Sequence, residues 1–187
     1  MTNDATPTAI LRDQHRNILK VADILEEVLS NEREPGAFDY KAIELCIDFI
    51  RLYADALHHG KEEDLLFPEL EARGMPRDSG PIAVMLQEHQ QGRVYVKHMR
   101  DAFEPARGGD QDAAKRLLHA GLGYVSLIRG HILKEDNVLF GMADQMIEGP
   151  ACQALCARYD GVCAHTFEGH TVSELEGLLR QLQGMYP

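Results

Sequence analysis

Two ten-residue segments of the chain place an imidazole and a carboxylate four residues apart in the same way. They are residues 58–67 and 131–140, and each reads His, three residues, Glu, two polar residues, two aliphatic residues and Phe, with Lys before the Glu. On a helix, positions i and i+4 lie one turn apart on the same face. Buried imidazoles and carboxylates need a partner, so two copies of one half-site predict a two-metal centre.

Further histidines fall at matching positions on the helices expected around these half-sites. Together with the His and Glu of the two half-sites they make six polar residues, which lie on or beside the apolar stripes of four different helices. A rise of about 1.5 Å per residue places all six about 10–18 Å from the same end of a bundle. A zinc site usually closes with four ligands, whereas imidazole combined with bridging carboxylate suits iron or manganese. The six residues are His15, His58, Glu62, His89, His131 and Glu135.

The elements that must position these residues are long amphipathic helices separated by short loops containing Gly or Pro. Pro68 is expected to kink or shorten the end of the second helix, and Asp110 is expected to cap the fourth. Long helices joined by short loops predict an all-α, antiparallel up-down four-helix bundle. We expect its helices over residues 8–30, 38–73, 81–106 and 110–147.

A C-terminal helical extension is expected beyond the bundle. Gly149 and Pro150 stop the fourth helix, and a further helical portion, split near Gly161, follows them. The sequence therefore predicts two parts, a bundle over residues 1–147 and an extension over residues 148–187 that packs on the same domain.

These motifs resemble the hemerythrin-like family, the HHE cation-binding domains. The resemblance spans about residues 8–147, and its most specific part is H-H-x-K-E-E-x-L-L-F-P at residues 58–68. It implies a four-helix bundle with a non-haem di-iron centre, bridged by an oxo or hydroxo group or by carboxylates. In that centre His15, His58, His89 and His131 would be terminal ligands, and Glu62 and Glu135 would bridge the two iron ions.

One position departs from the oxygen-carrying hemerythrins. Those proteins place a second His one turn after the ligand of the third helix, where this chain has Arg93. Some hemerythrin-like domains take a carboxylate ligand from the position directly after the second helix's His, which is His59 here. Adjacent helical residues diverge by about 100°, so His58 and His59 could straddle the two-iron axis. We predict that His59 is the fifth imidazole; the alternative is an outer or surface residue.

The resemblance implies a protein that binds or senses a small diatomic ligand, oxygen or nitric oxide. The alternatives are a di-iron enzyme acting on peroxide or nitric oxide, a protein supplying iron for iron–sulfur repair, or an iron store. Ferritin-like proteins are a structural rival, but their Glu-x-x-His order is reversed here, and residue 128 is Ile. The sequence leaves open whether the protein is an enzyme, and any signal would pass to a separate, unidentified protein partner.

Composition limits the classes of binding partner and the cellular compartment that we expect for this protein. The 187-residue chain has a formal charge of −11, which argues against nucleic acid and anionic membranes as partners. It has no apolar run of 18 residues, and Met1 to Pro7 lacks the apolar core of a secretory signal. Without a C-x-x-C pair, a reducing cytoplasm is the simplest setting, and packed thiols are favoured over a zinc or redox site. The cysteines are Cys46, Cys152, Cys156 and Cys163.

Overall fold

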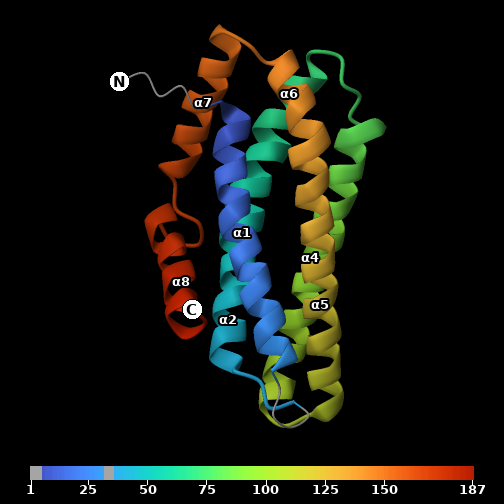
Figure 1. Cartoon of the computed structure of the whole chain (residues 1–187), viewed down its shortest axis with the longest axis vertical. Coiled ribbons are helices and arrows are strands. Elements are labelled where there is room, and N and C mark those ends of the chain that lie inside the picture. The colour runs from blue at the N-terminus through green and yellow to red at the C-terminus, as the bar shows by residue number, and fades with distance from the viewer. Residues whose placement is uncertain (1–5, 32–35) are drawn as a thin grey trace.

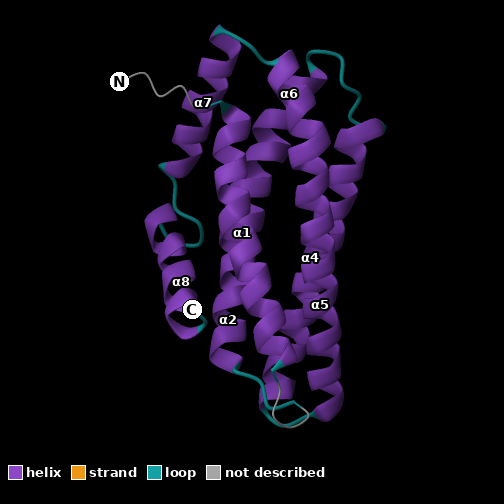
Figure 2. Ribbon diagram, in the orientation of Figure 1, coloured by secondary structure: helices purple, strands orange, loops and turns teal. Residues whose placement is uncertain are grey.

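The computed structural model describes residues 6–31 and 36–187, and within these ranges the protein is helical. Figure 2 draws helices and loops, and no strand, among the described residues. An isolated bridge between Phe167 and His170 is their single strand-like pairing. This confirms the all-α class. The loop expected between the first two helices falls partly on residues 32–35, and the N-terminal stretch falls partly on residues 1–5. Both ranges lie outside the described residues.

The bundle has the predicted up-down course (Figure 1). The chain descends along α1 (Pro7–Ser30) and rises through α2 (Tyr40–Phe49) and the helical segments that follow it. It then descends along α4 (Gly80–Arg107) and rises along α5 (Gln111–Lys134). Neighbouring arms are therefore antiparallel, and the arms meet side by side along the length of the bundle.

Side-chain caps fix where several of these helices begin. Thr6 accepts a hydrogen bond from the backbone N–H of Ala9 at the start of α1, and Asp39 caps α2 in the same way. Asp110 accepts from the backbone of Asp112 and Ala113, which confirms its predicted role at the start of α5. The second helix begins at Tyr40, two residues later than expected, because Asp39 is its cap.

The second and fourth arms contain wide π-helical segments that the sequence did not predict. In the second arm η1 (Ile50–His59) and η2 (Glu62–Leu66) precede α3 (Phe67–Glu71), which has Pro68 in its first turn. In the fourth arm η3 (Glu135–Leu139) separates α5 from α6 (Phe140–Met146). The segments η2 and η3 each begin at the Glu of a half-site and end before its Phe. The sequence repeat is therefore also a repeat of backbone conformation, and π-helical turns are frequent at functional sites.

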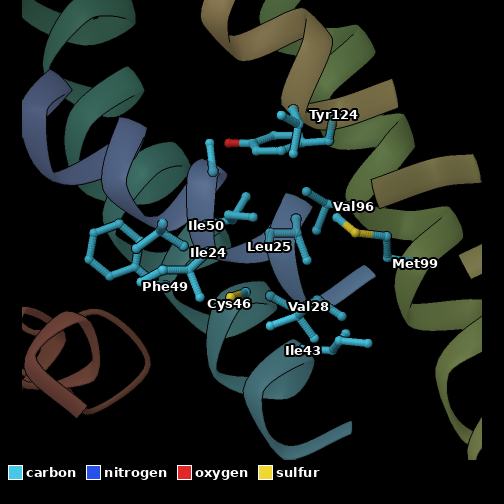
Figure 3. Packing of buried hydrophobic residues seen from close by; sticks show 14 of the residues in the cluster. Ile24, Leu25, Val28, Ile43, Cys46, Phe49, Ile50, Val96, Met99 and Tyr124 are labelled. Atoms are coloured by element: carbon cyan, nitrogen blue, oxygen red, sulfur yellow. The ribbon is translucent and has the colours of Figure 1, made fainter. Parts of the chain in front are cut away.

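The hydrophobic core is divided into two clusters. One fills most of the bundle and includes Leu57 and Ile128, and Figure 3 shows part of it around Leu25, Ile50 and Val96. The other lies toward the end that carries α3 and α6, and includes Leu11, Met85 and Leu139. Along each arm a half-site or a candidate ligand lies between residues of the first cluster and residues of the second. The candidate metal ligands therefore form a polar layer with apolar packing on both sides.

Close helix packing explains one glycine in the fourth arm. A Cβ atom at Gly121 would lie 2.3 Å from Cδ1 of Leu29, so α5 can approach α1 at this point because the position has no side chain. The apolar stripe of the fourth helix predicts an inward Met142, but this side chain is 38% exposed, so that prediction was wrong.

The C-terminal segment packs along the outside of the bundle as α7 (Pro150–Cys163) and α8 (Val172–Met185) (Figure 1). The extension is split as predicted, although α7 continues through Gly161 to Cys163 and the turn follows at residues 164–171. Contacts join α7 to η2 and α1, and α8 to α2 and α1. The division of the chain at residue 147 stays a prediction. Among the described residues, no helix combines the length and apolar character needed to cross a membrane.

Candidate metal centre

The structure brings all seven predicted ligand residues into one buried layer. Each is no more than 4% exposed, although each carries an imidazole or a carboxyl group. They fall into two groups whose candidate ligand atoms lie within 4.8 Å of one another. The α1-side group consists of His15, His58, Glu62 and Glu135, and the pocket-side group consists of His59, Glu62, His89 and His131.

The two carboxylates connect these groups. Oε1 of Glu62 lies 3.6 Å from Nε2 of His58, and its Oε2 lies 3.4 Å from Nε2 of His89. Oε2 of Glu135 lies 3.1 Å from Nε2 of His15 and 3.3 Å from Nε2 of His131. Each carboxylate therefore reaches histidines of both groups, which is the arrangement expected of two bridging ligands.

Acidic residues directly after the two glutamates orient the histidines of α1 and α4. Nδ1 of His89 lies 2.7 Å from Glu63, and Nδ1 of His15 lies 2.9 Å from Asp136. The two contacts are equivalent in the half-site repeat, since Glu63 follows Glu62 and Asp136 follows Glu135. Each half-site therefore supplies a carboxylate to the centre and a second carboxylate that holds the histidine of a neighbouring helix.

Residues directly before the histidines of α1 and α4 complete the same pattern. Oε1 of Gln14 lies 3.1 Å from Nδ1 of His58, and Oε2 of Glu88 lies 3.0 Å from Nδ1 of His131. The hydrogen bonds thus run from each arm of the bundle to the next around the whole layer. His59 stands outside this ring, because its Nδ1 lies 3.3 Å from Asp55 of its own helix.

The outward hydrogen bonds determine which ring nitrogen faces inward. Each Nδ1 faces an oxygen that accepts a hydrogen bond, so Nδ1 carries the proton and Nε2 of the neutral ring presents a lone pair. The Nε2 atoms of His89 and His131 lie 3.2 Å apart, and neither has a proton to donate in this tautomer. A proton or a metal ion between them makes this approach favourable.

The remaining inward atoms are also without hydrogen-bond partners in the described part of the chain. The carboxylate oxygens of Glu62 and Glu135 and the Nε2 atoms of His15, His58 and His59 are all buried and unpaired. Unpaired polar atoms are rare in protein interiors, because each loses its hydrogen bonds to water. Seven such acceptors in one layer fit metal coordination, and they match the donor types of the predicted centre.

The pKa values of the buried groups show that the side chains of this layer alone do not balance one another's charge. Burial raises the pKa of Glu62, and the nearby carboxylate of Glu135 raises it further. For Glu135 itself, His131 and His15 outweigh burial and hold its pKa well below the usual range. Burial lowers the pKa of His15, but Asp136 and Glu135 together raise it to about 9. For His59, burial dominates and lowers the pKa to about 3, so this ring is neutral and available as a ligand.

Aromatic rings seal the layer toward the second hydrophobic cluster. Phe140 stacks on His15 with ring centroids 5.3 Å apart, and Phe67 stacks on His89 at 6.0 Å. Phe67 and Phe140 are the last residues of the two sequence repeats. Each half-site therefore ends with a ring that packs against the histidine that the same half-site orients, which accounts for the Phe in both copies.

Sequence reasoning missed the residues that orient the histidines. The signal was available, because an acidic residue follows each half-site glutamate and an acidic or amide residue precedes His15 and His89. Arg93 was noted only as a missing histidine. In the structure its guanidinium donates to Asp55 at 2.9 Å and to Glu63 at 2.8 Å, the two acids that face His59 and His89.

A pocket of about 160 Å³ adjoins the layer on one side and reaches His59 and His89. Other histidines lie elsewhere, as predicted, since His98 and His119 are exposed. Cys152 and Cys156 are partly buried on α7 and Cys163 is exposed, and none of the three is in a disulfide bond.

Comparison with known proteins gives an independent view of the same residues. Residues 6–143 match the model of the hemerythrin HHE cation-binding domain. An uncharacterized protein of Mycobacterium tuberculosis and one of Mycobacterium bovis are each 30% identical over 134 residues, 72% of this chain and 51% of theirs. An iron-sulfur cluster repair protein, YtfE, of Musicola paradisiaca is 32% identical over 148 residues, 75% of this chain and 65% of that protein. The chain thus spans about half the length of the mycobacterial relatives.

Proposed function

The chain belongs to the hemerythrin HHE cation-binding family, and on this premise we propose that it is a non-haem di-iron protein that binds or senses a small diatomic ligand. His15 and His58 would hold one iron ion on the α1 side. His59, His89 and His131 would hold the other on the pocket side. Glu62 and Glu135 would be shared between the two ions.

The observation that carries this proposal is the set of unpaired inward acceptors in the layer. Five imidazoles and two carboxylates exceed what one four-coordinate zinc ion takes up, and the mixture of imidazole and carboxylate suits iron. Both carboxylates lie between the two groups of histidines, at 3.1–3.6 Å from their Nε2 atoms. Two ions with shared carboxylates use every one of these atoms.

The pocket supports the pocket-side iron as the place where an external ligand binds. When bound, iron supplies an open coordination position and electrons for reversible binding of oxygen or nitric oxide. The chain's own contribution is to hold His59 and His89 rigidly at the pocket, through Asp55, Glu63 and Arg93, and to exclude bulk water from the rest of the layer. His15, by contrast, is stacked beneath Phe140.

A second candidate function is supply of iron to damaged iron–sulfur centres. The observation that favours it is the similarity to the iron-sulfur cluster repair protein of Musicola paradisiaca. The matched region is 75% of this chain and 65% of that protein, so the rest of that relative is unmatched. A di-iron enzyme acting on peroxide or nitric oxide would use the same centre.

Iron quantification followed by absorption spectroscopy tests the proposal. Protein from iron-replete cells should carry about two iron atoms per chain, since the two groups provide ligands for two ions. The reduced protein should then give a stable and reversible charge-transfer band with oxygen or nitric oxide. The Glu62→Ala variant, which loses a shared ligand, gives the baseline. One tightly bound zinc ion and no iron would contradict the proposal, and rapid irreversible oxidation with peroxide consumption would favour an enzyme.

A further inference from the structure

The first helix of the C-terminal segment covers a buried pair of polar side chains. Lys61 of the second arm is fully buried, and its Nζ atom has no hydrogen-bond partner among the described residues. Tyr159 of α7 is 1% exposed, and its hydroxyl is unpaired within the same part of the chain. The Nζ atom of Lys61 lies 5.5 Å from the centroid of the Tyr159 ring. The contact between α7 and the second arm therefore contains two polar groups that have lost their hydrogen bonds to water.

This pair makes the closed position of α7 unfavourable for both polar groups. A cation over an aromatic ring recovers part of the hydration that a buried ammonium group loses, but hydrogen bonds or a counter-charge are needed for the rest. Tyr159 cannot provide the counter-charge, because burial raises its pKa and keeps the hydroxyl neutral. Moving α7 away from the bundle would return both groups to water. Hydration of Lys61 and Tyr159 therefore favours opening of this helix.

The apolar anchoring of α7 is small by comparison with that of α8. Of the residues of α7, all of them described, Leu155 and Tyr159 are buried, whereas α8 buries three leucines. A capping box of Thr171 and Glu174 also fixes the start of α8, and among the described residues no side chain caps the start of α7. Segments with few buried apolar contacts open at the lowest free energy. Local opening of the C-terminal segment should therefore begin at α7.

The connections at the two ends of α7 allow it to move as a unit. Gly149, directly before the helix, has a φ of +59°, a conformation that glycine adopts readily, and the turn over residues 164–171 follows the helix. Hinges are a few loop or helix-end positions that absorb large changes in backbone angle. Figure 1 shows α7 on the outside of the bundle beside α1, which it contacts. The helix also lies outside residues 6–143, so this arrangement belongs to the C-terminal segment and not to the matched domain.

We propose that α7 is a hinged cover over the first half-site, and that its opening is the route by which iron enters and leaves the centre. The inference rests on the proposed function, because only a centre that holds iron uses such a route. Lys61, which α7 covers, directly precedes Glu62, one of the two shared carboxylates. The described residues that line the pocket beside His59 include none from α7, so ligand access and iron exchange take place at separate positions.

Release of iron from the iron-loaded, oxidised protein to excess desferrioxamine tests the proposal. The test variant is Leu155→Ala, which weakens the apolar contact of α7. The matched control is Leu179→Ala, which deletes the same side chain from a buried position of α8. A second test variant, Tyr159→Phe, keeps the ring and removes the unpaired hydroxyl. Hydrogen exchange of the α7 amides is measured in every protein, and it reports opening of the helix whether or not iron is bound.

The expected result is that the two test variants change iron release in opposite directions. Leu155→Ala should release iron about tenfold faster than the parent protein, because loss of a buried leucine side chain strongly weakens the packing around it. Leu179→Ala should release iron at the parent rate. Tyr159→Phe should release it a few-fold more slowly, because the closed position no longer buries an unpaired hydroxyl. Hydrogen exchange at α7 should change in the same order.

Three results would overturn the cover. They are equal release rates in Leu155→Ala and Leu179→Ala, release from Tyr159→Phe that is no slower than from the parent, and α7 amides that exchange no faster than those of α8. If Leu155→Ala does not fold, the direction of the Tyr159→Phe effect decides the question. A parent protein that takes up no iron would instead overturn the proposed function, and hydrogen exchange would still test the opening of α7.

Discussion

The two half-sites share a common frame but differ in the residue after the first histidine. Residues 58–67 and 131–140 each provide an inward histidine, a shared carboxylate that starts a π-helical segment, an orienting acid and a stacking Phe. At the next position one half-site has His59 and the other has Ile132. His59 enters the polar layer of candidate ligands, whereas Ile132 joins the hydrophobic core. A single position therefore makes a near-symmetric centre unequal.

The lysines before the two glutamates show a second difference. Lys61 is fully buried, and its Nζ lies 5.5 Å from the centroid of the Tyr159 ring on α7. Lys134 is 43% exposed and pairs with Glu88. The C-terminal extension therefore covers one half-site and leaves the other uncovered. The repeated sequence gives each half-site the same candidate ligands, and the surroundings then give the two sides different access.

The substitution with the largest expected effect on both half-sites removes a shared carboxylate. Glu62→Ala or Glu135→Ala should lower the iron content of both positions together, because each carboxylate faces histidines of both groups. The loss of affinity should exceed about 100-fold, since removing an orienting partner alone costs 10–100-fold. Elemental analysis after dialysis measures the effect. Loss of one ion with full retention of the other would mean that the carboxylate belongs to a single position.

Replacing His59 with the residue of the other half-site should have a more local effect. The variant His59→Ile should weaken the pocket-side ion selectively, because it removes one of three imidazoles from that group and none from the α1-side group. We expect close to one iron per chain under conditions that fill both positions in the parent protein. Ile132→Val is the control at the equivalent position, and it should keep both ions. Two ions of unchanged affinity in His59→Ile would assign His59 to a structural role.

The orienting acids offer a matched pair of smaller changes. Glu63→Gln should weaken the pocket-side ion and Asp136→Asn the α1-side ion, each by about tenfold, because the amide keeps an acceptor for Nδ1–H but loses the charge. Competition with a chelator, followed by iron spectroscopy, separates the two positions. The same weakened position in both variants would show that the ring of hydrogen bonds does not act in the pairs described.

The smallest expected effect concerns the pocket. Gly92→Ala places a Cβ 3.8 Å from Leu127 and Tyr124, an ordinary contact, and should slow ligand entry a few-fold without changing iron content. Replacing a mid-helix glycine should also stabilise the protein by about 0.5–1 kcal/mol. Gly130→Ala has no atom within 4 Å and isolates the helix effect. Stopped-flow ligand binding and thermal melts give both quantities, and equal association rates in the two variants would place the access route elsewhere.

Much of this arrangement could be predicted from the sequence because it follows from the spacing of the residues along the helices. The His and Glu pairs at i and i+4, and the apolar stripes on which they lie, predict the bundle and one layer of six polar residues. His59 was added to that set from the family resemblance. The start of the fourth helix at Asp110 followed from capping chemistry. The family resemblance, now supported by the match over residues 6–143, came from the same motifs.

Other features could not be predicted because they depend on tertiary contacts. The residues of the π-helical segments at Glu62 and Glu135 carry no local signal that separates these segments from an α-helix. The split near Gly161 was predicted, but the end of α7 at Cys163, two residues later, was not. The role of Arg93 depends on Asp55, which lies 38 residues away in the chain. Neither residue alone signals the pairing.

Crystallography of the iron-loaded protein, with anomalous scattering at the iron edge, tests the central claim most directly. The account predicts two anomalous peaks in the buried layer, one contacted by His15 and His58 and the other by His59 and His89. Glu62 and Glu135 should contact both, and the His59 nitrogen should lie within about 2.3 Å of its ion, slightly beyond the usual zinc distance. A single peak, or a His59 ring turned away from the second one, would contradict the account.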